Sequence, residues 1–391
     1  ARSFEVARTY RFAKGSGMPI SIPVIEMIEI GAGGGSLAWV DAMGRIQTGP
    51  ESAGSEPGPA SYGRGGDKPA ITDADLVLGK LDPENFAGGA IKLSAAAAEA
   101  AISTHVGAEL GLAAEAAAFG IVEVVDENMA NAARVHAVEN GKNISENVMI
   151  AFGGAAPLHA ARLCEKLGIS QCLIPMGAGV GSAIGFLRAP FGYEAVASKI
   201  IRLGAWNAKT VNGLIAGLKA QAEGFVQAGT RAATRCEIVA YMRYVGQGWE
   251  IPVALADRDF EQEDVNLLRQ AFRENYARFF GRAIDGASGL EIEVVTWSVK
   301  VQAIQPLPPS IRLGLSGRAR AVPVSRAVFD PVTGGRLHSA VAERGDLQAG
   351  DHIVGPAVIV ETETATVVTS SFDAVVQEDG SLMLIRKGTV Q

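Results

Sequence analysis

Alternating apolar and polar segments give the first part of the chain an order of strand, glycine-rich turn, hairpin and helices. An apolar run at residues 20–30 predicts a strand, and the glycine-rich segment 31–36 follows it directly. Residues 37–46 predict a hairpin that turns at Met43-Gly44. Strong helix formers occupy residues 94–140, so we expect helices there.

Cap signals bound the predicted helical region. Ser94 precedes an alanine run, as an N-cap residue does, and Asn140-Gly141 is typical of a helix end. A break at residues 107–112 predicts two helices rather than one. Residues 148–152 then predict a buried strand, and Gly153-Gly154 a turn that leads into another helix.

Composition shifts along the chain predict three domains. Residues 1–192 are predicted as an α/β core, 193–304 as an α+β domain and 305–391 as a small β module after a Pro-rich linker at 305–310. Within the middle domain, the pattern predicts helices at 207–228 and 261–280, and strands at 235–254 and 290–305.

Composition favours an ordinary globular protein that binds a small molecule. Hydrophobic residues make up 48% of the chain and charged residues 20%, and the net charge of −7 disfavours nucleic acid or an anionic membrane as partner. The 3 cysteines lack the spacing of a disulfide framework or a zinc site, which favours a reducing cytoplasm. The 47 glycines are clustered, which indicates turns or close backbone approach to a ligand.

Two glycine-rich turns are the strongest candidates for a ligand site. Residues 31–36 follow an apolar strand, where bare backbone N–H groups close around phosphate oxygens. The segment is not a Walker A motif, because it lacks Gly-Lys-Ser/Thr, so a plain hairpin stays an alternative interpretation. At residues 152–160 two glycines separate a strand from a helix start, where a ribose or a flat ring fits against backbone. Close packing is the alternative there.

Longer motifs make the chain resemble the hydantoinase A family, which includes N-methylhydantoinase and 5-oxoprolinase subunits and the related acetone and acetophenone carboxylase subunits. The likeness extends over nearly the whole chain. The motifs that carry it are Ile28–Asp41, Gly49–Ala60, Tyr62–Gly65, Thr72–Gly79, Ala151–Ala160, Arg243–Gln247, Leu347–Gly350, Gly355–Ile359 and Thr364–Val368.

The resemblance implies the actin-like ATPase fold, a ribonuclease H-like α/β architecture that actin shares with acetate and sugar kinases and heat-shock chaperones. It implies that ATP with Mg²⁺ phosphorylates the carbonyl oxygen of a cyclic amide before ring opening, usually beside a hydantoinase B-type subunit. The phosphates are then expected at Gly33, Gly34, Gly35 and Ser36, and the adenosine at Gly153, Gly154 and Ala155.

The family's first phosphate loop is expected upstream of Ala1. We therefore expect an N-terminal half of the same subunit, separate or cleaved, to complete the ATP site, and the isolated chain to be inactive. The same motifs serve ATP-dependent ketone carboxylases, so a carboxylase subunit is the second hypothesis. A noncatalytic assembly module with a vestigial cleft is the third.

The candidates for catalysis are Asp41, Asp73 and His159, with Asp75 as a further carboxylate close to Asp73. Asp41 ends a hairpin strand and Asp73 follows the long loop, as does Asp75, so one of these carboxylates is expected to orient a nucleophile or to hold Mg²⁺ through water. A helix cap is the alternative role for Asp73. His159 lies in the second glycine motif, where it either touches the ligand or packs at the helix start. No metal-ligating cluster is predicted from the histidines.

Overall fold

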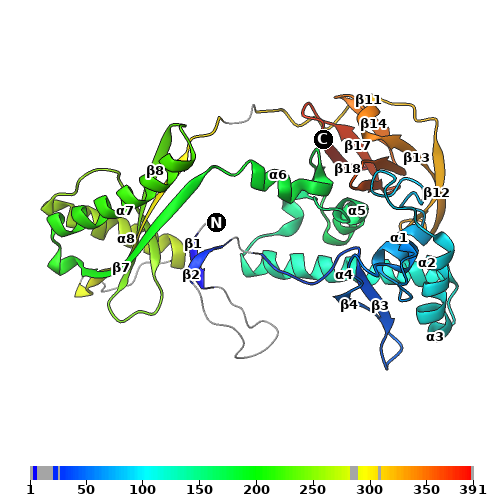
Figure 1. The fold of residues 1–391 in the computed structure, drawn as a ribbon, viewed down its shortest axis with the longest axis horizontal. Coiled ribbons are helices and arrows are strands. Elements are labelled where there is room, and N and C mark those ends of the chain that lie inside the picture. The colour runs from blue at the N-terminus through cyan, green and yellow to red at the C-terminus, as the bar shows by residue number, and fades with distance from the viewer. Residues whose placement is uncertain (1–2, 7–20, 25–26, 282–288, 307–309, 389–391) are drawn as a thin grey trace. The chain divides into compact units, whose positions relative to one another are not determined.

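The computed structural model describes residues 3–6, 21–24, 27–281, 289–306 and 310–388. The chain divides into two compact units, and each unit draws on two separate stretches of sequence (Figure 1). The smaller unit comprises Ala1–Glu26 and Arg188–Pro308, and the larger unit comprises Met27–Leu187 and Pro309–Gln391. Both units mix helices with sheets, as the sequence predicted for an α/β chain.

The larger unit is built on a mixed six-stranded sheet. In spatial order its strands are β11 (Arg318–Ala319), β14 (Asp351–Val354), β17 (Phe372–Val376), β18 (Leu382–Arg386), β6 (Gln171–Ile174) and β5 (Met149–Ile150). Strand β18 pairs antiparallel with β6, and β6 pairs parallel with β5. The sequence predicted residues 305–391 as a separate β module. The structure differs, because these strands share a sheet and an apolar core with β5 and β6.

A second sheet, a hairpin and six helices complete the larger unit. The sheet contains β12 (Ser325–Asp330), β13 (Gly335–Glu343), β15 (Ala357–Val360) and β16 (Ala365–Val368), and the hairpin contains β3 (Ser36–Val40) and β4 (Ile46–Ser52). The helices are α1 (Ile71–Val77), α2 (Ala95–Ile102), α3 (Ala108–Leu110), α4 (Ala114–Glu139), α5 (Ala156–Leu167) and α6 (Gly181–Leu187). Helix α4 packs against both α1, which carries Asp75, and α5, which carries His159.

Several local predictions for this unit are confirmed. Ser94 caps α2, because its Oγ accepts a hydrogen bond from Ala97 N at 3.2 Å. The hairpin turns at Gly44, whose φ of 73° favours glycine. The predicted strand at residues 20–30 is only partly correct: residues 21–24 form a strand and residues 27–30 do not. Positions 20, 25 and 26 lie outside the described residues.

The smaller unit is a four-stranded antiparallel sheet with two long helices. In order the strands are β7 (Gly192–Arg202), β10 (Ile292–Ala303), β8 (Thr234–Tyr244) and β9 (Ile251–Leu255); the helices are α7 (Ala208–Gly229) and α8 (Val265–Phe280), and β1 (Ser3–Val6) pairs with β2 (Ser21–Val24). The single strand predicted at 235–254 is two strands, with a turn at Gly246. Part of the predicted linker, residues 307–309, lies outside the described residues.

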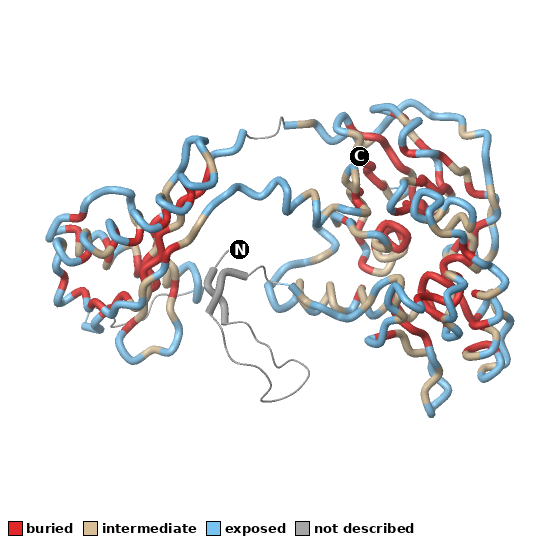
Figure 2. The backbone as a smooth tube through the Cα atoms, in the orientation of Figure 1, coloured by how far each residue is buried: buried red, intermediate tan, exposed pale blue. Residues whose placement is uncertain are grey.

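Each unit has its own buried core (Figure 2). In the smaller unit Trp297 is fully buried, and its Nε1 donates a hydrogen bond to Lys199 O at 3.0 Å. In the larger unit Phe372 and Leu382 are fully buried within the core of the six-stranded sheet. None of the helices in the described ranges is long and apolar enough to cross a bilayer.

Candidate functional site

The first wall of a cavity in the larger unit is the glycine loop that leads into β3. Gly33, Gly34 and Gly35 line this cavity. Thr72 donates two hydrogen bonds to Gly34 O, from its backbone N at 2.8 Å and from Oγ1 at 2.9 Å. Ser36 differs from the prediction: it is 5% exposed, does not line the cavity, and accepts a hydrogen bond from Gly33 N at 3.0 Å. Its hydroxyl therefore shapes the loop from behind.

The second wall is the glycine pair at the start of α5. Gly153, Gly154 and Ala155, which the sequence predicted to face the adenosine, all line the cavity. Gly153 has a φ of 115°, a conformation that side-chain-bearing residues rarely adopt. Thr364 Oγ1 donates to Gly154 O at 2.8 Å, which fixes the turn against the β15–β16 hairpin.

The third wall is the β15–β16 turn, residues 360–365, which lies largely between two of the motifs that carry the family likeness and was not predicted as part of the site. It carries two acidic side chains, Glu361 and Glu363. Glu361 Oε1 lies 2.8 Å from the buried Arg344 Nη1, and Arg344 also donates to Gly380 O at 2.6 Å. The salt bridge therefore holds one end of this turn against the six-stranded sheet. No local signal in the sequence places this turn beside glycine loops some 200 or more positions earlier.

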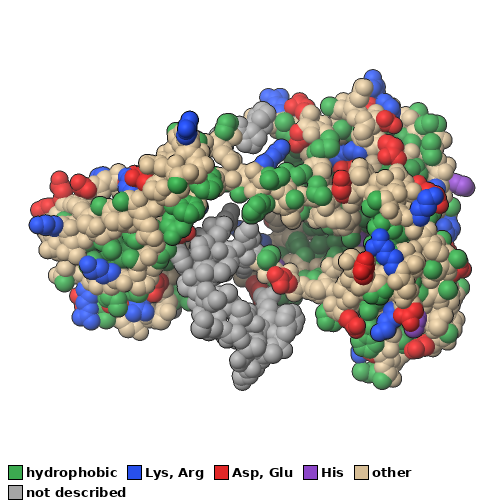
Figure 3. All heavy atoms as spheres, viewed as in Figure 1, with side chains coloured by type: hydrophobic (Ala, Val, Ile, Leu, Met, Phe, Trp, Pro, Cys, Tyr) green, Lys and Arg blue, Asp and Glu red, His purple; other side chains and the backbone are tan. Residues whose placement is uncertain are grey.

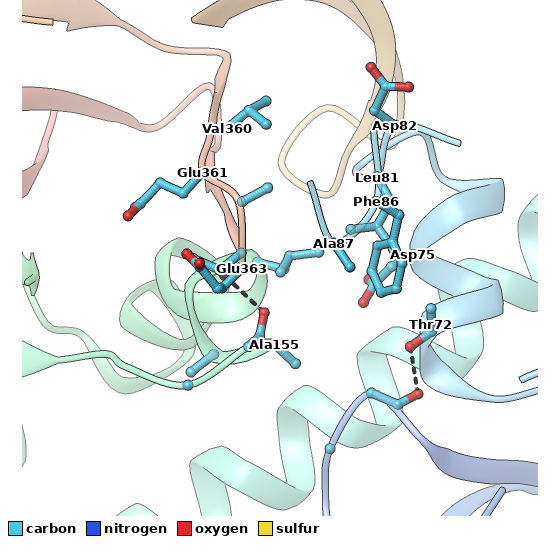
Figure 4. Close-up of a pocket in the computed structure, with 18 of the residues that line it drawn as sticks. Thr72, Asp75, Leu81, Asp82, Phe86, Ala87, Ala155, Val360, Glu361 and Glu363 are labelled. Atoms are coloured by element: carbon cyan, nitrogen blue, oxygen red, sulfur yellow. Dashed lines mark hydrogen bonds between the residues drawn. The ribbon is translucent and has the colours of Figure 1, made fainter. Parts of the chain in front are cut away.

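The fourth side of the cavity is the segment 81–87. The Tyr62 ring packs against Phe86 at a tilt of 49°, with ring centroids 5.8 Å apart. The cavity has a volume of about 830 Å³. Figure 4 shows Glu361 and Glu363 on one side of it and Phe86 with Asp75 on the other. A cavity of this size suits a cofactor or a substrate with its co-substrate.

Asp75 is the cavity-lining carboxylate with the most constrained surroundings. Its Oδ1 lies 2.8 Å from Lys80 Nζ, and its Oδ2 lies 3.3 Å from His159 Nε2. Burial raises the pKa of Asp75, but the positive charges of Lys80 and His159 outweigh this effect and lower the pKa to about 2. Asp75 is therefore a carboxylate that stays ionised although almost no water reaches it.

His159 lies between two carboxylates. Its Nδ1 is 2.8 Å from Asp126 Oδ1, on the opposite side of the ring from Asp75. Burial lowers the pKa of His159, but the charges of Asp75 and Asp126 raise it to about 9. His159 is thus a buried cation behind the cavity wall, and not a residue that lines it. The sequence predicted that His159 either touches the ligand or packs at the helix start. In the structure it contacts Asp75, and Asp75 rather than His159 lines the cavity.

Asp73, by contrast, does not line the cavity. Its carboxylate accepts hydrogen bonds from three backbone N–H groups, those of Ala60 at 3.1 Å, Ser61 at 2.8 Å and Ala70 at 2.8 Å. These bonds cap α1 and close the preceding loop, so the geometry favours the cap role that the sequence left open. The candidate catalytic carboxylate is therefore Asp75 rather than Asp73.

Asp41 also lies away from the cavity, at the hairpin turn between β3 and β4. Its Oδ1 accepts hydrogen bonds from Met43 N at 2.9 Å and Arg45 N at 3.0 Å. Hydrogen bonds from Arg45 hold the pKa of Asp41 well below its usual range. The structure gives Asp41 a turn-forming role and no contact with the cavity.

The cavity contains acidic residues but no evident metal centre. Among the residues that the structure describes, no group of three or more His, Cys, Asp or Glu side chains is arranged to hold a metal ion. On the face shown in Figure 3, basic and acidic side chains are interspersed rather than gathered by sign. This surface does not resemble a nucleic-acid site.

Comparison with known sequence families gives two adjoining matches. The Hydantoinase/oxoprolinase family matches residues 2–195, and the Hydantoinase/oxoprolinase C-terminal domain matches residues 205–385. The chain is 33% identical to an uncharacterized protein of Methanocaldococcus jannaschii over 96% of this chain and 53% of that protein. It is 30% identical to the caprolactamase alpha subunit of Pseudomonas jessenii over 89% of this chain and 51% of that subunit.

Two solved structures resemble the chain over most of its length. Nucleotide-free acetone carboxylase, described as carrying out ATP-dependent acetone carboxylation, aligns with a TM-score of 0.81 and 26% identity over 94% of this chain and 54% of that chain. The ATP-dependent caprolactamase of Pseudomonas jessenii aligns with a TM-score of 0.72 and 28% identity over 94% of this chain and 54% of that chain. The chain thus spans about half the length of these relatives.

Proposed function

Because the chain belongs to the hydantoinase/oxoprolinase family, we propose that it forms part of an ATP-dependent cyclic-amide hydrolase. In this enzyme ATP transfers its γ-phosphoryl group to the carbonyl oxygen of the amide and ADP is released. Water then adds to the carbonyl carbon, the ring C–N bond breaks with a proton going to the nitrogen, and inorganic phosphate leaves. The observation that carries the proposal is the ionised Asp75 at the wall of a cavity that also has two glycine turns. The names of two relatives, both ATP-dependent, agree with nucleotide use.

Each wall of the cavity has a part in the proposed reaction. Gly33, Gly34 and Gly35 face the β- and γ-phosphates with their backbone, and the turn at Gly153 and Gly154 faces the adenosine. One turn for the phosphates and a second turn for the adenosine are typical of the actin-like ATPase fold, which we propose for the larger unit. Mg²⁺ is proposed as the ion that accompanies the phosphates. Among the described residues no group of three or more His, Cys, Asp or Glu side chains is arranged to hold it.

Asp75 is the proposed proton acceptor. A carboxylate with a pKa near 2 is fully ionised at neutral pH, so it can accept a hydrogen bond from an attacking water and orient it. Such a carboxylate is a weak base, and it takes the proton only as the bond to the carbonyl carbon forms, because the water then becomes strongly acidic. Lys80 and His159 are committed to Asp75 and orient its two oxygens. Asp75 thus presents one fixed carboxylate to the cavity.

The site is proposed to be completed by further polypeptide. Two partners are proposed: the polypeptide that corresponds to the other half of the relatives, and a hydantoinase B-type subunit. The relatives include a subunit named alpha, which agrees with a multi-subunit enzyme. We expect the isolated chain to bind Mg-ATP weakly and to turn over no substrate. Tight Mg-ATP binding by the isolated chain in a calorimetric titration would contradict this part of the proposal.

The deciding experiment measures ADP release by the assembled enzyme. A panel of lactams and hydantoins is compared with a ketone plus bicarbonate, and Asp75→Asn serves as the inactive control. ADP release that depends on a cyclic amide and yields the ring-opened acid supports the hydrolase. Release that depends on ketone and bicarbonate instead establishes the second candidate, a carboxylase subunit, which the TM-score of 0.81 to acetone carboxylase favours.

The third candidate, a noncatalytic assembly module, makes a separate prediction. If the cleft is vestigial, ATP gives no hydrogen-exchange protection to residues 31–36 in the assembled enzyme. A functional phosphate loop is protected, because its amides bind the phosphates. The exchange experiment therefore separates a silent cleft from an enzyme whose substrate has not yet been found.

A further inference from the structure

Asp126 is a charged residue in the middle of helix α4 with no exposed surface. Its Oδ1 lies 2.8 Å from His159 Nδ1, although the ring N–H is not aligned for a hydrogen bond. A buried, ionised carboxylate is costly unless a nearby charge compensates it. The charge that compensates Asp126 is the imidazolium of His159.

The charges of four buried side chains cancel only when all four are counted together. The side chains of Asp75, Lys80, His159 and Asp126 are 2%, 8%, 3% and 0% exposed. With His159 protonated, two cations face two anions and the cluster is neutral. Without Asp126, the remaining anion already has Lys80 as its partner, so nothing holds a second cation in place.

A small chamber adjoins this cluster, because Lys80 and Asp126 both line it. Its volume is about 20 Å³, and Asp126, Lys80, Arg162 and Thr369 are among the residues that line it. This volume accommodates one water molecule. Asp126 Oδ2 is buried and has no hydrogen-bond partner within the described protein, so a water here gives its second oxygen a partner. A water in the chamber would thus solvate the carboxylate of Asp126, of which only one oxygen faces His159.

We propose that Asp126 is a positioning residue: it keeps the His159 ring charged and oriented so that Nε2 faces Asp75, and thereby fixes the proton acceptor in the cavity. This rests on the proposed function only in taking Asp75 as the proton acceptor. Helix α4 contributes to the site through the contact between Asp126 and His159. In the sequence, Asp126 follows Asp75 by 51 residues and precedes His159 by 33. Asp126 does not line the cavity and touches no substrate.

The first test needs no turnover. The chain has 5 histidines, so selective ¹⁵N labelling of histidine with a His159→Gln reference spectrum identifies His159. The expected result is an imidazolium at about pH 7 in the wild type and in Asp126→Glu, and a neutral ring at about pH 7 in Asp126→Asn. A neutral His159 in the wild type, or an unchanged imidazolium in folded Asp126→Asn, overturns the proposal.

The second test is kinetic and uses the assembled enzyme with its best substrate. Asp126→Asn is expected to lower kcat by about 10- to 100-fold with little change in KM for ATP, and to change the pH profile, while Asp126→Glu recovers much of the rate. Glu127→Gln is the matched control, since Glu127 is the next residue but pairs with Arg134 on the surface. Unchanged kcat in folded Asp126→Asn overturns the proposal. If no substrate is found, the proposed function fails, but the NMR test still decides the role of Asp126.

Discussion

Thr72 Oγ1 donates a hydrogen bond to the carbonyl oxygen of Gly34 at 2.9 Å, across 38 residues of sequence. The Thr72 backbone N–H donates to the same oxygen at 2.8 Å. The first turn of α1 therefore clamps the middle of the glycine loop. Asp75, one turn later on the same helix, lines the cavity, so a single short helix sets both the loop and the carboxylate.

Thr72→Val is expected to weaken nucleotide binding about fivefold. The change keeps the side-chain shape but removes the hydroxyl, which loses one hydrogen bond of about 1 kcal/mol from the loop. Calorimetric titration of the assembled enzyme with Mg-ATP measures it. Thr72→Ser, which keeps the hydroxyl, is the control. Equal affinity in the Val and Ser variants would show that the loop does not depend on this bond.

Asp75→Asn is expected to reduce turnover by about 100-fold or more while ATP still binds. The variant keeps the shape of the side chain but cannot accept a proton, and general-base catalysis is worth about 10² to 10⁴ in rate. Steady-state ADP release and an ATP titration on the same preparation separate the two effects. Asp82→Asn is the matched control, because Asp82 also lines the cavity but its side chain is 44% exposed, whereas that of Asp75 is 2% exposed. An equal loss of turnover in both variants would mean that turnover depends on the total negative charge of the cavity and not on Asp75 as a proton acceptor.

Asp73→Asn is expected to destabilise the larger unit by about 2 to 4 kcal/mol. Asp73 accepts three backbone N–H bonds, and an amide replaces one of its acceptor oxygens with a donor that faces other donors. Urea unfolding of the chain measures the change. The same substitution at exposed Asp67 serves as control. A stable Asp73→Asn protein that is catalytically dead would instead return Asp73 to the catalytic residues.

The buried ion pairs predict how stability depends on pH. The pKa of His159 is raised from 6.5 to about 9, so its contribution is complete below about pH 6.5 and is lost as the pH rises through 9; it is on the order of 3 kcal/mol. The pKa of Asp75 is lowered from 3.8 to about 2, so its contribution is present above about pH 4 and is lost as the pH falls through 2. Urea unfolding at several pH values measures both effects.

The control for the loss of stability that we expect as the pH rises toward 9 is His159→Gln. This variant cannot titrate, so its stability is expected to change little between about pH 6.5 and 9, although it is lower overall. A wild-type protein whose stability is equally flat over this range would show that His159 is not charged in the folded state.

Sequence reasoning located the two glycine turns because each carries its signal within a few residues. Gly33–Gly35 follow an apolar run and Gly153-Gly154 precede a helix, and both segments line the cavity. The choice between Asp73 and Asp75 was not accessible in this way. The two residues lie two positions apart on one helix and therefore point to different sides of it. Only the packing of α1 shows which carboxylate faces backbone amides and which faces the cavity.

The contributions from distant segments could not be predicted from local patterns. Asp126 sits in an alanine-rich helix, where an acidic residue usually faces solvent, yet the packing of α4 on α5 buries it against His159. The β15–β16 turn joins the site through Thr364 and Gly154, 210 residues apart. For the same reason residues 305–391, which read as a self-contained β module, complete a sheet with β6.

Gly153→Ala is expected to weaken ATP binding by about 5- to 30-fold, on the view that the turn between β5 and α5 faces the adenosine. The φ of Gly153 is 115°, and a residue with a Cβ reaches it only with strain of about 1 to 2 kcal/mol, although open space surrounds the position. The turn is therefore expected to relax toward an ordinary conformation, which displaces the backbone that lines the cavity.

Gly185→Ala is the matched control for this prediction. Gly185 lies in helix α6, where a Cβ meets no neighbouring atom within 4 Å and the backbone is helical. Alanine is a better helix former than glycine, so this variant is expected to bind ATP like the wild type and to be equally or more stable. If Gly153→Ala binds Mg-ATP as tightly as Gly185→Ala in the same titration, the left-handed turn is needed for the chain to fold but not for the nucleotide.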